Sequence, residues 1–473
     1  MKKTIYSLSI SLLLCFSANA QNSLKSAWES FLKNDTEAAK KSFEELAKQP
    51  QFANDANLSL SLLAELEQKN DDAFNYFQKF YVGNKNVEPY LSALWRSPAV
   101  NSSYSKIRPE AMLLMNEIVK NKSFDGSLNA MASSVIGKHY LNVKKTAESE
   151  KAFAQIGNLD HWLITSTFEN ISTSGFDKNY APINHPQMDA KFTGKKNVEF
   201  GWRKVPYLKR EKWFDFTFYD DSYNAILFAQ TFVNAPSEIE GQLRIGVSGS
   251  VKVWVNDQLI ITEAEERNND LDSYISTLKL NKGYNRILVQ IGESYAGNSN
   301  FMLRLTDNNG YPIPGLTHIN EYQPYQKEES FKAQSITPKA YAYFKNLVAA
   351  DTTNYLNQLL LAKLYLRDDF VFEPRIILEK LKQKFPESTY LNTLMITLHS
   401  KEDNRTGVET LQEQIKTSDP QSTYALRLTY SDYYNQENYD KAEEIMMQLE
   451  KRFGEDEDNC TLGKHIARRV NRA

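Results

Sequence analysis

The sequence feature that most constrains the fold is a run of alternating apolar and polar residues between Gln242 and Thr306. Leu243, Ile245 and Val247 alternate with polar or small neighbours, and the same pattern returns further along the run. A period of two predicts half-buried β-strands. The turn dipeptides between the apolar runs are Asn256-Asp257, Lys282-Gly283 and Asn309-Gly310. We therefore expect a β-sandwich of strands that are joined by tight turns.

The segment before this block has helical spacing. Ala39 and Phe43 are four residues apart, and Ala73 and Phe77 repeat that pair 34 residues later. A third match has a small residue and an aromatic on each of two helices: Gly137, Tyr140, Ser149 and Phe153. A helix-turn-helix unit of about 34 residues is the period of the tetratricopeptide repeat, and this segment resembles that family.

The segment after the block shows the same period. Thr337-Pro338 is typical of a helix start, with an N-cap residue followed by proline. Ala442 stands 12 residues beyond Tyr430, as the repeat requires. Helix terminators recur every 34 residues, at Phe385-Pro386, Asp419-Pro420 and Phe453-Gly454. We expect a second tetratricopeptide-repeat array over residues 338–458.

The central block carries a more specific resemblance. Gly175-Phe176-Asp177, Val253–Asn256 and Lys282–Leu288 occur in the order seen in galactose-binding-like jelly-roll domains of secreted bacterial proteins. The chain resembles large envelope proteins of Gram-negative bacteria, which join repeats, such a sandwich, further repeats and a transglutaminase-like domain. The resemblance covers most of residues 22–458. It implies a multidomain α and β fold in which tetratricopeptide-like arrays flank a jelly-roll β-sandwich.

Two positions depart from that pattern. Related sugar-binding sandwiches carry acidic residues before the Trp-Val-Asn strand, where carboxylates can bind calcium. Here that position reads Val247-Ser248-Gly249-Ser250, so we do not expect a calcium-assisted sugar site. The catalytic residues of a transglutaminase-like domain also have no place in this chain.

The first twenty residues have the pattern of a secretory signal peptide. Lys2 and Lys3 precede an apolar run that is too short to span a bilayer, and small residues precede Gln21. We expect an exported, periplasmic or extracellular protein. Removal of the two lysines leaves 54 basic residues (56 − 2) against 59 acidic ones, a net charge of −5. This balance argues against a nucleic-acid partner. No later apolar run is long enough to predict a membrane span.

These patterns predict a division along the chain. The predicted segments are a signal peptide (1–20), a tetratricopeptide-like array (21–158), a galactose-binding-like sandwich (159–318), a linker (319–337), a second array (338–458) and a tail (459–473).

Few residues suggest catalysis. Cys460 and His465 are the one cysteine–histidine pair to test as nucleophile and base, but a short basic tail offers them no core. The six histidines are scattered, and none is paired at metal-ligand spacing. We therefore predict no catalytic residue, no metal and no cofactor. The acidic run at 263–266 is expected to be solvated surface.

One loop is a candidate ligand site. Trp213, Asp220, Asp221 and Tyr223 combine aromatics with carboxylates, which can form a polar rim beside a stacking platform for sugar rings. Trp202 and Trp254 are further aromatic candidates. The alternative is structural: a sandwich needs an aromatic core, and Asp-Asp-Ser between two strands is an ordinary turn.

The order of repeats, sandwich and repeats predicts a secreted, non-catalytic binding or scaffold protein. Helical repeats offer concave grooves for envelope or extracellular proteins or peptides, and the sandwich could bind polysaccharide. The alternative is the regulatory or substrate-presenting N-terminal part of a truncated transglutaminase-like enzyme, an expectation motivated by the abrupt end after Asp458.

Overall fold

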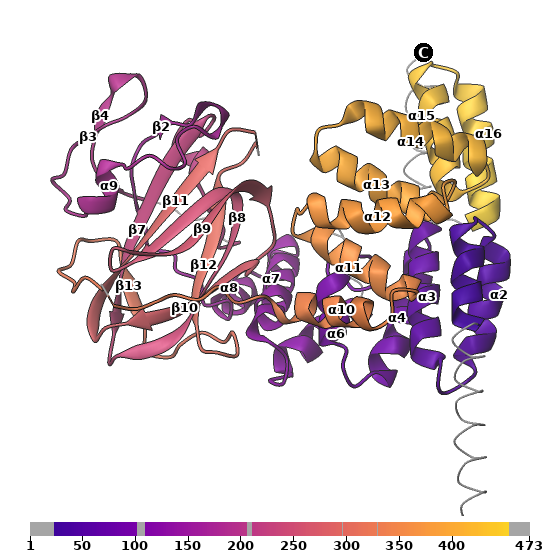
Figure 1. Cartoon of the computed structure of the whole chain (residues 1–473), viewed down its shortest axis with the longest axis horizontal. Helices are drawn as coiled ribbons and strands as arrows, with labels where there is room; N and C mark the ends of the chain where they lie inside the picture. The colour runs from indigo at the N-terminus through magenta and orange to yellow at the C-terminus, as the bar shows by residue number, and fades with distance from the viewer. Residues whose placement is uncertain (1–22, 102–108, 206–210, 296, 329, 454–473) are drawn as a thin grey trace, which may run out of the picture. The chain divides into compact units, whose positions relative to one another are not determined.

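The computed structural model describes residues 23–101, 109–205, 211–295, 297–328 and 330–453. Helices precede and follow a large antiparallel sheet (Figure 1). The mixed α and β, multidomain class predicted from the sequence is therefore confirmed. The predicted signal peptide (1–20), the predicted tail (459–473) and the Cys460–His465 pair lie outside the described residues.

Packing divides the described chain into two compact units that do not follow chain order. The helical unit contains residues 23–101, 343–366 and 370–453. The sheet unit contains the described residues between 109 and 342, together with 367–369. Helices between 109 and 154 therefore pack with the sheet, whereas the domain boundaries predicted from the sequence group them with the first helical array (21–158).

The helices of the helical unit are residues 23–32, α2 (Thr36–Ala47), α3 (Ala53–Leu66), α4 (Asn70–Gly83), α5 (Glu88–Ala93), α10 (Lys339–Ala350), α11 (Tyr355–Arg367), α12 (Phe372–Lys384), α13 (Thr389–Lys401), α14 (Arg405–Ser418), α15 (Thr423–Asn435) and α16 (Tyr439–Phe453). The first four residues of α10 and the last residue of α11 belong to the sheet unit. Within the described part of the chain, no helix is both long enough and apolar enough to cross a membrane.

The spacing of these helices follows the predicted 34-residue interval. α11, α13 and α15 begin at Tyr355, Thr389 and Thr423, each 34 residues after the last. Phe385-Pro386 directly follows α12, and Asp419-Pro420 directly follows α14. The predicted helix terminators are confirmed at these positions, because proline cannot continue a helix and Phe385 and Asp419 leave helical geometry.

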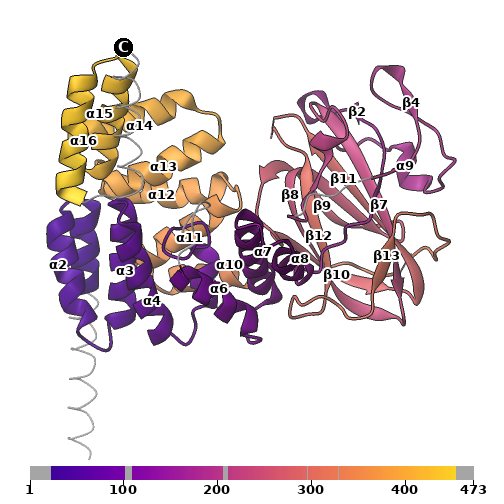
Figure 2. The same cartoon turned by 180° about the vertical axis from the view of Figure 1, so that it is seen from behind.

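The two chain segments of the helical unit pack against each other. The rings of Phe31 and Tyr390 lie 5.1 Å apart, and Lys363 Nζ lies 2.8 Å from Glu65 Oε1. Two further sets of hydrogen bonds join Asn34 to Glu387 and Thr389, and Thr423 to Glu67. In Figures 1 and 2 the indigo helices α2 and α3 lie beside the orange and yellow helices of this unit.

This packing buries some helices on more than one face. In α3 every residue from 56 to 64 is buried, and α11 buries ten of its thirteen residues. By contrast, α12 and α14 bury three and two residues. The helices α3 and α11 are therefore central in the unit, and α12 and α14 lie at its surface.

The elements of the sheet unit are α6 (Pro109–Lys120), α7 (Gly126–Asn142), α8 (Thr146–Ala154), α9 (Ala181–Asn184), β1 (Leu163–Ile164), β2 (Phe168–Glu169), β3 (Phe192–Thr193), β4 (Glu199–Phe200), β5 (Arg203–Lys204), β6 (Phe214–Asp215), β7 (Ala225–Ala235), β8 (Ile239–Val255), β9 (Gln258–Asn268), β10 (Tyr274–Leu280), β11 (Gly283–Glu293), β12 (Asn300–Thr306) and β13 (Thr317–Ile319). The main sheet has the strand order β5-β1-β7-β11-β8-β12-β6, and all of its pairs are antiparallel.

The long strand β8 belongs to two groups of strands. Its first half pairs with β10 and β12, and its second half pairs with β11 and β9. The pairing register shifts next to Gly249, whose φ is +119°. A Cβ there would lie 2.5 Å from the Gly292 carbonyl oxygen, so only glycine fits this bend.

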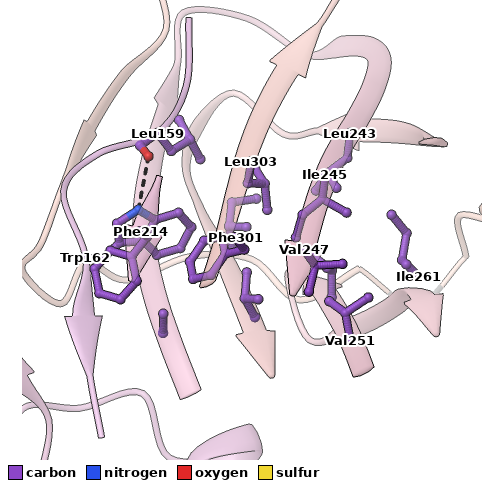
Figure 3. Close-up of a cluster of buried hydrophobic side chains, with 14 of the residues drawn as sticks. Leu159, Trp162, Phe214, Leu243, Ile245, Val247, Val251, Ile261, Phe301 and Leu303 are labelled. Atoms are coloured by element: carbon purple, nitrogen blue, oxygen red, sulfur yellow. Dashed lines mark hydrogen bonds between the residues drawn. The ribbon is translucent and has the colours of Figure 1, made fainter. Parts of the chain in front are cut away.

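A single apolar cluster fills one face of the sheet (Figure 3). It includes Trp162, Phe214, Val251 and Phe301, and the indole nitrogen of Trp162 donates a hydrogen bond to the Leu159 carbonyl at 3.0 Å. Because a strand presents alternate residues to opposite faces, β7 contributes to this cluster and also to a second one on its other face.

The prediction of half-buried strands is wrong for the central strands. β8 and β11 are buried along almost their whole length on both faces. The positions of β8 that alternate with the apolar residues are buried as well: Gly246, Ser248 and Ser250 are small, and Gln242 and Arg244 are covered with their side chains hydrogen-bonded. The second face of β7 and β11 is covered by apolar residues between 163 and 202 and by Tyr322 and Tyr325.

Helix α7 is attached to the sheet by buried charges. Arg244 on β8 donates to Asp125, the N-cap residue of α7, at 2.6 Å. Ser127 Oγ donates to Asp272 at 2.7 Å, and Gly126 N donates to the Asn309 carbonyl at 2.7 Å. These contacts explain why α6–α8 belong to the sheet unit.

The predicted turns are confirmed by backbone geometry. Asn256 and Asp257 have φ values of +51° and +71°, Gly283 has +94° and Gly310 has +83°. Positive φ at both central residues is the mark of the hairpin turn that joins β8 and β9. β6 ends at Asp215, and a 3₁₀ turn over Phe216–Phe218 follows it.

The prediction that the acidic run at 263–266 is solvated surface is wrong for Glu266. This residue is 6% exposed, and its carboxylate accepts hydrogen bonds from the backbone N–H groups of Ser294 and Tyr295 at 2.9 and 3.1 Å. The run lies on β9, and the Glu266 side chain points toward the residues that directly follow β11.

Candidate functional site

The loop predicted as a ligand site lies between β6 and β7. Asp220 is engaged within the protein, because its carboxylate accepts hydrogen bonds from Ser166 Oγ at 2.7 Å and Arg203 Nη2 at 3.2 Å. Asp221 is exposed, and Tyr223 is 61% exposed. The loop therefore presents Asp221 and Tyr223 at the surface while Asp220 fixes its conformation.

The aromatic candidates separate into surface and core. Trp213 is partly buried and lies directly before β6, outside the loop. Trp202 and Trp254 are 5% and 7% exposed and belong to the second apolar cluster. They are core residues, so a sugar ring cannot stack on them. Phe218, which the sequence did not single out, is 62% exposed in the same loop as Tyr223.

Two of the three motifs that carry the jelly-roll resemblance, Val253–Asn256 and Lys282–Leu288, meet in space. Asn256 Nδ2 donates to Asn285 Oδ1 at 2.8 Å, and Arg286 N donates to Asn256 Oδ1 at 3.0 Å. The Arg286 guanidinium is buried and contacts Asp257 at 3.0 Å. It also donates to the carbonyls of Pro182 and Ile183 and to Gln230. These side chains hold the hairpin and the α9 segment together, so their role is structural.

Tyr325 completes this buried network. Its hydroxyl donates to Asp257 Oδ1 at 2.7 Å. Burial raises the pKa of Tyr325 well above its ordinary value, and the nearby carboxylate of Asp257 adds to the shift. The phenol therefore remains a hydrogen-bond donor at neutral pH.

A hollow on the helical unit has the size of a ligand pocket. It lies across α2, α3 and α4 and has a volume of about 420 Å³. Its lining residues are Glu44, Ala47, Lys48, Asn57, Leu60, Tyr76 and Lys79. Leu60 and Asn57 are buried, and the charged residues are exposed. Pockets for small molecules or peptide side chains span roughly 300–1,000 Å³.

Tyr76 and Lys79 form one wall of this hollow. Lys79 Nζ lies 5.0 Å from the centre of the Tyr76 ring, within reach of a cation–π contact. Burial raises the pKa of Tyr76, and the charge of Glu44 adds to the shift. The hollow thus combines a floor of one apolar residue, Leu60, and one amide, Asn57, with charges of both signs and an aromatic hydroxyl.

Sequence reasoning missed one cluster of side chains that could hold a metal. Within the described ranges, Asp160, His161 and His318 form such a cluster. Asp160 Oδ1 lies 2.8 Å from His161 Nδ1 and 2.9 Å from His318 Nε2, and the two nitrogens are 3.3 Å apart. No sequence spacing could reveal this cluster, because 157 residues separate the two histidines.

The carboxyl group of Asp160 is strongly perturbed. Burial by itself would raise its pKa, but hydrogen bonding to His318 and the charge of Lys212, whose Nζ lies 3.2 Å from Oδ2, hold it well below the ordinary value. Asp160 is therefore ionised throughout the physiological pH range.

Comparisons with known proteins add little. No family model matches the sequence, and no curated protein matches it. One solved structure that matches is a beta-glucosidase from Kluyveromyces marxianus in complex with glucose, at 13% sequence identity and a TM-score of 0.20. The match covers 44% of this chain and 23% of the glucosidase chain. A TM-score this low carries no argument about fold or function.

Proposed function

We propose that this chain is an exported, non-catalytic binding and scaffold protein of the bacterial envelope. In this proposal the helices are tetratricopeptide-like, which the 34-residue interval between α11, α13 and α15 supports. The close approach of α7 and α8 also supports it: Ser149 Oγ donates to the Gly137 carbonyl at 2.8 Å, and the Phe153 ring packs against Gly137. The sheet unit is then a galactose-binding-like jelly roll.

The hollow across α2, α3 and α4 carries this proposal. The central helices α3 and α11 are largely buried within the unit, so they offer little open surface to a partner. The hollow is open to solvent, and it pairs buried Leu60 and Asn57 with the charged residues Lys48, Lys79 and Glu44. This combination suits an extended peptide that inserts an apolar side chain and presents charged neighbours.

Affinity capture from solubilised envelope with residues 21–473 would test the proposal, with mass spectrometry to identify retained proteins. We expect Tyr76→Ala and Lys79→Glu to lose partners that the unmodified protein retains. Lys41→Glu is the matched control, because Lys41 is exposed on α2 and does not line the hollow. Equal retention by all variants would contradict the assignment. Deletion of residues 338–458 is unsuitable, since it would uncover α3.

A second candidate function is polysaccharide binding by the loop between β6 and β7. The observation that favours it is the exposure of Phe218 and Tyr223 on either side of Asp221. Aromatic faces beside a carboxylate can stack on a sugar and accept its hydroxyl hydrogens. Calorimetry with envelope polysaccharide should show binding that Tyr223→Ala weakens and Tyr295→Ala, an equally exposed tyrosine of the same unit, leaves intact. No saturable heat with the unmodified protein would remove this candidate.

A further inference from the structure

The topology of the sheet brings Asp160, His161 and His318 together. One edge of β7 pairs with β11 along its whole length. The other edge pairs with β1 at residues 229–230 and with β13 at residues 232–234. Asp160 and His161 lie just before β1, and His318 is the middle residue of β13. These side chains therefore meet where two short strands follow each other along the same edge.

The spacing of the three ligand atoms suits a small metal ion. Four ligands at the usual Zn²⁺ distances of about 2.0–2.1 Å lie roughly 3.3 Å apart in a tetrahedron. The two imidazole nitrogens are 3.3 Å apart, and the carboxylate oxygen is 2.8 and 2.9 Å from them. An outward shift of about half an ångström by the carboxylate oxygen would complete three corners of that tetrahedron.

Hydrogen bonding favours the form of His318 that can ligate. The backbone N–H of Asp160 donates to His318 Nε2 at 3.0 Å. Nε2 also lies 2.9 Å from Asp160 Oδ1. With its ring hydrogen on Nδ1, His318 would offer the Nε2 lone pair to a cation bound between these two atoms.

We propose that Asp160, His161 and His318 form a zinc site with one open coordination position. Two imidazoles and one carboxylate are donor atoms that Zn²⁺ accepts. The His161 side chain is 58% exposed, so water or a further ligand can reach the ion from that side. Lys212 Nζ lies 3.2 Å from the other carboxylate oxygen, Oδ2, so Oδ1 is the oxygen that faces the histidines. This proposal does not depend on the partner-binding function.

The charge of Lys212 leads to a prediction about the Zn²⁺ affinity of the site. Its ammonium group lies beside the carboxylate and repels a bound cation. Lys212→Gln should therefore bind Zn²⁺ more tightly than the unmodified protein. The affinity for Zn²⁺ bound elsewhere on the chain would not respond to this change.

The test is a Zn²⁺ titration of the full chain without a histidine tag, in competition with a chromophoric chelator. We expect one saturable equivalent per chain, and Co²⁺ in place of Zn²⁺ should give the visible absorption of a tetrahedral site. His161→Gln and His318→Gln should each weaken the affinity at least about 100-fold, more than changes around a metal site usually do. Because His161 is exposed, its replacement should leave folding intact.

His185→Gln is the matched control, because His185 is an exposed histidine of the same unit outside the cluster. It should bind Zn²⁺ like the unmodified protein. Thermal unfolding in a chelator should give the same midpoint for His161→Gln and the unmodified protein, which separates loss of the ion from loss of the fold. Two results would overturn the proposal: no saturable binding, or binding that survives the double replacement of His161 and His318 and is lost in Cys460→Ser.

Discussion

Arg304 is fully buried in the sheet unit, and each part of its guanidinium has a partner. Nε donates to the Ile156 carbonyl at 2.7 Å, Nη2 donates to the Gly310 carbonyl at 2.8 Å, and Nη1 forms an ion pair with Asp272. Burial lowers the pKa of Arg304, and the charge of Asp272 opposes that shift. Removal of the carboxylate charge leaves a buried cation without its counter-ion.

We therefore predict that Asp272→Asn lowers the free energy of unfolding of the sheet unit by about 3 kcal/mol. Asparagine tolerates the positive φ of +60° at this position, so the change tests charge rather than backbone strain. Urea unfolding, followed by tryptophan fluorescence, measures the effect. Glu321→Gln is the control, because its ion pair with Lys204 is at the surface and should matter little. An equal effect of both changes would refute the argument from burial.

Asp125 gives the sheet unit a defined response to acid. Burial would raise its pKa, but the guanidinium of Arg244 at 2.6 Å lowers it below the ordinary value. A carboxyl group whose pKa is depressed on folding stabilises the fold above its unfolded pKa of about 4. That contribution is lost as the pH falls from about 4 through the folded-state pKa.

The corresponding prediction concerns Asp125→Asn, which keeps the N-cap of α7 and removes only the charge. The difference in unfolding free energy between this variant and the unmodified protein should be largest near pH 7 and should shrink below about pH 4. Urea titrations at several pH values measure it. A difference that stays constant down to pH 3 would show that the charge of Asp125 does not stabilise the fold.

At the scale of elements, the contact of α7 with α8 depends on one glycine. A Cβ at Gly137 would lie 2.5 Å from the Phe153 ring, and the ring is 1% exposed and cannot turn away freely. In an open helix Gly→Ala stabilises by about 1 kcal/mol. Here we predict that Gly137→Ala destabilises the sheet unit by about 1–3 kcal/mol, because an extra methyl group overpacks the contact.

The combination with Phe153→Leu supplies the control for this prediction. A smaller side chain leaves room for the alanine methyl group, so Gly137→Ala should cost less in that background than in the unmodified protein. Thermal unfolding of the four proteins in the cycle gives the coupling. Purely additive effects would place the strain elsewhere than between these two residues.

Elements that depend on neighbours in sequence could be predicted, and those that depend on distant residues could not. Asn256-Asp257 and Phe385-Pro386 mark a turn and a helix end by their own backbone preferences. Asp220 looked like a ligand residue because its partners, Ser166 and Arg203, are 54 and 17 residues away. Glu266 looked solvated because its partners are the backbone groups of Ser294 and Tyr295.

At the scale of the whole molecule, the sequence pattern predicted two helical arrays on either side of the sandwich, and packing joins residues from both ends of the chain. Lys363 and Glu65 form an ion pair across 298 residues. Burial alone would lower the pKa of Lys363, but the charge of Glu65 raises it above the ordinary value. The 34-residue period predicts where helices lie along the chain, but it does not predict which helices pack against each other.

A cut in the middle of the chain should therefore fail to separate its halves. The turn at Lys282-Gly283 joins β10 to β11, and Lys282 is exposed, so a protease recognition sequence can be inserted after Lys282. After cleavage each fragment still contributes helices to the helical unit and strands to the sheet unit. We predict that the two fragments co-elute in size-exclusion chromatography without denaturant and separate in urea. Fragments that part under native conditions would mean that contacts such as Phe31 with Tyr390 and Lys363 with Glu65 do not hold the unit together.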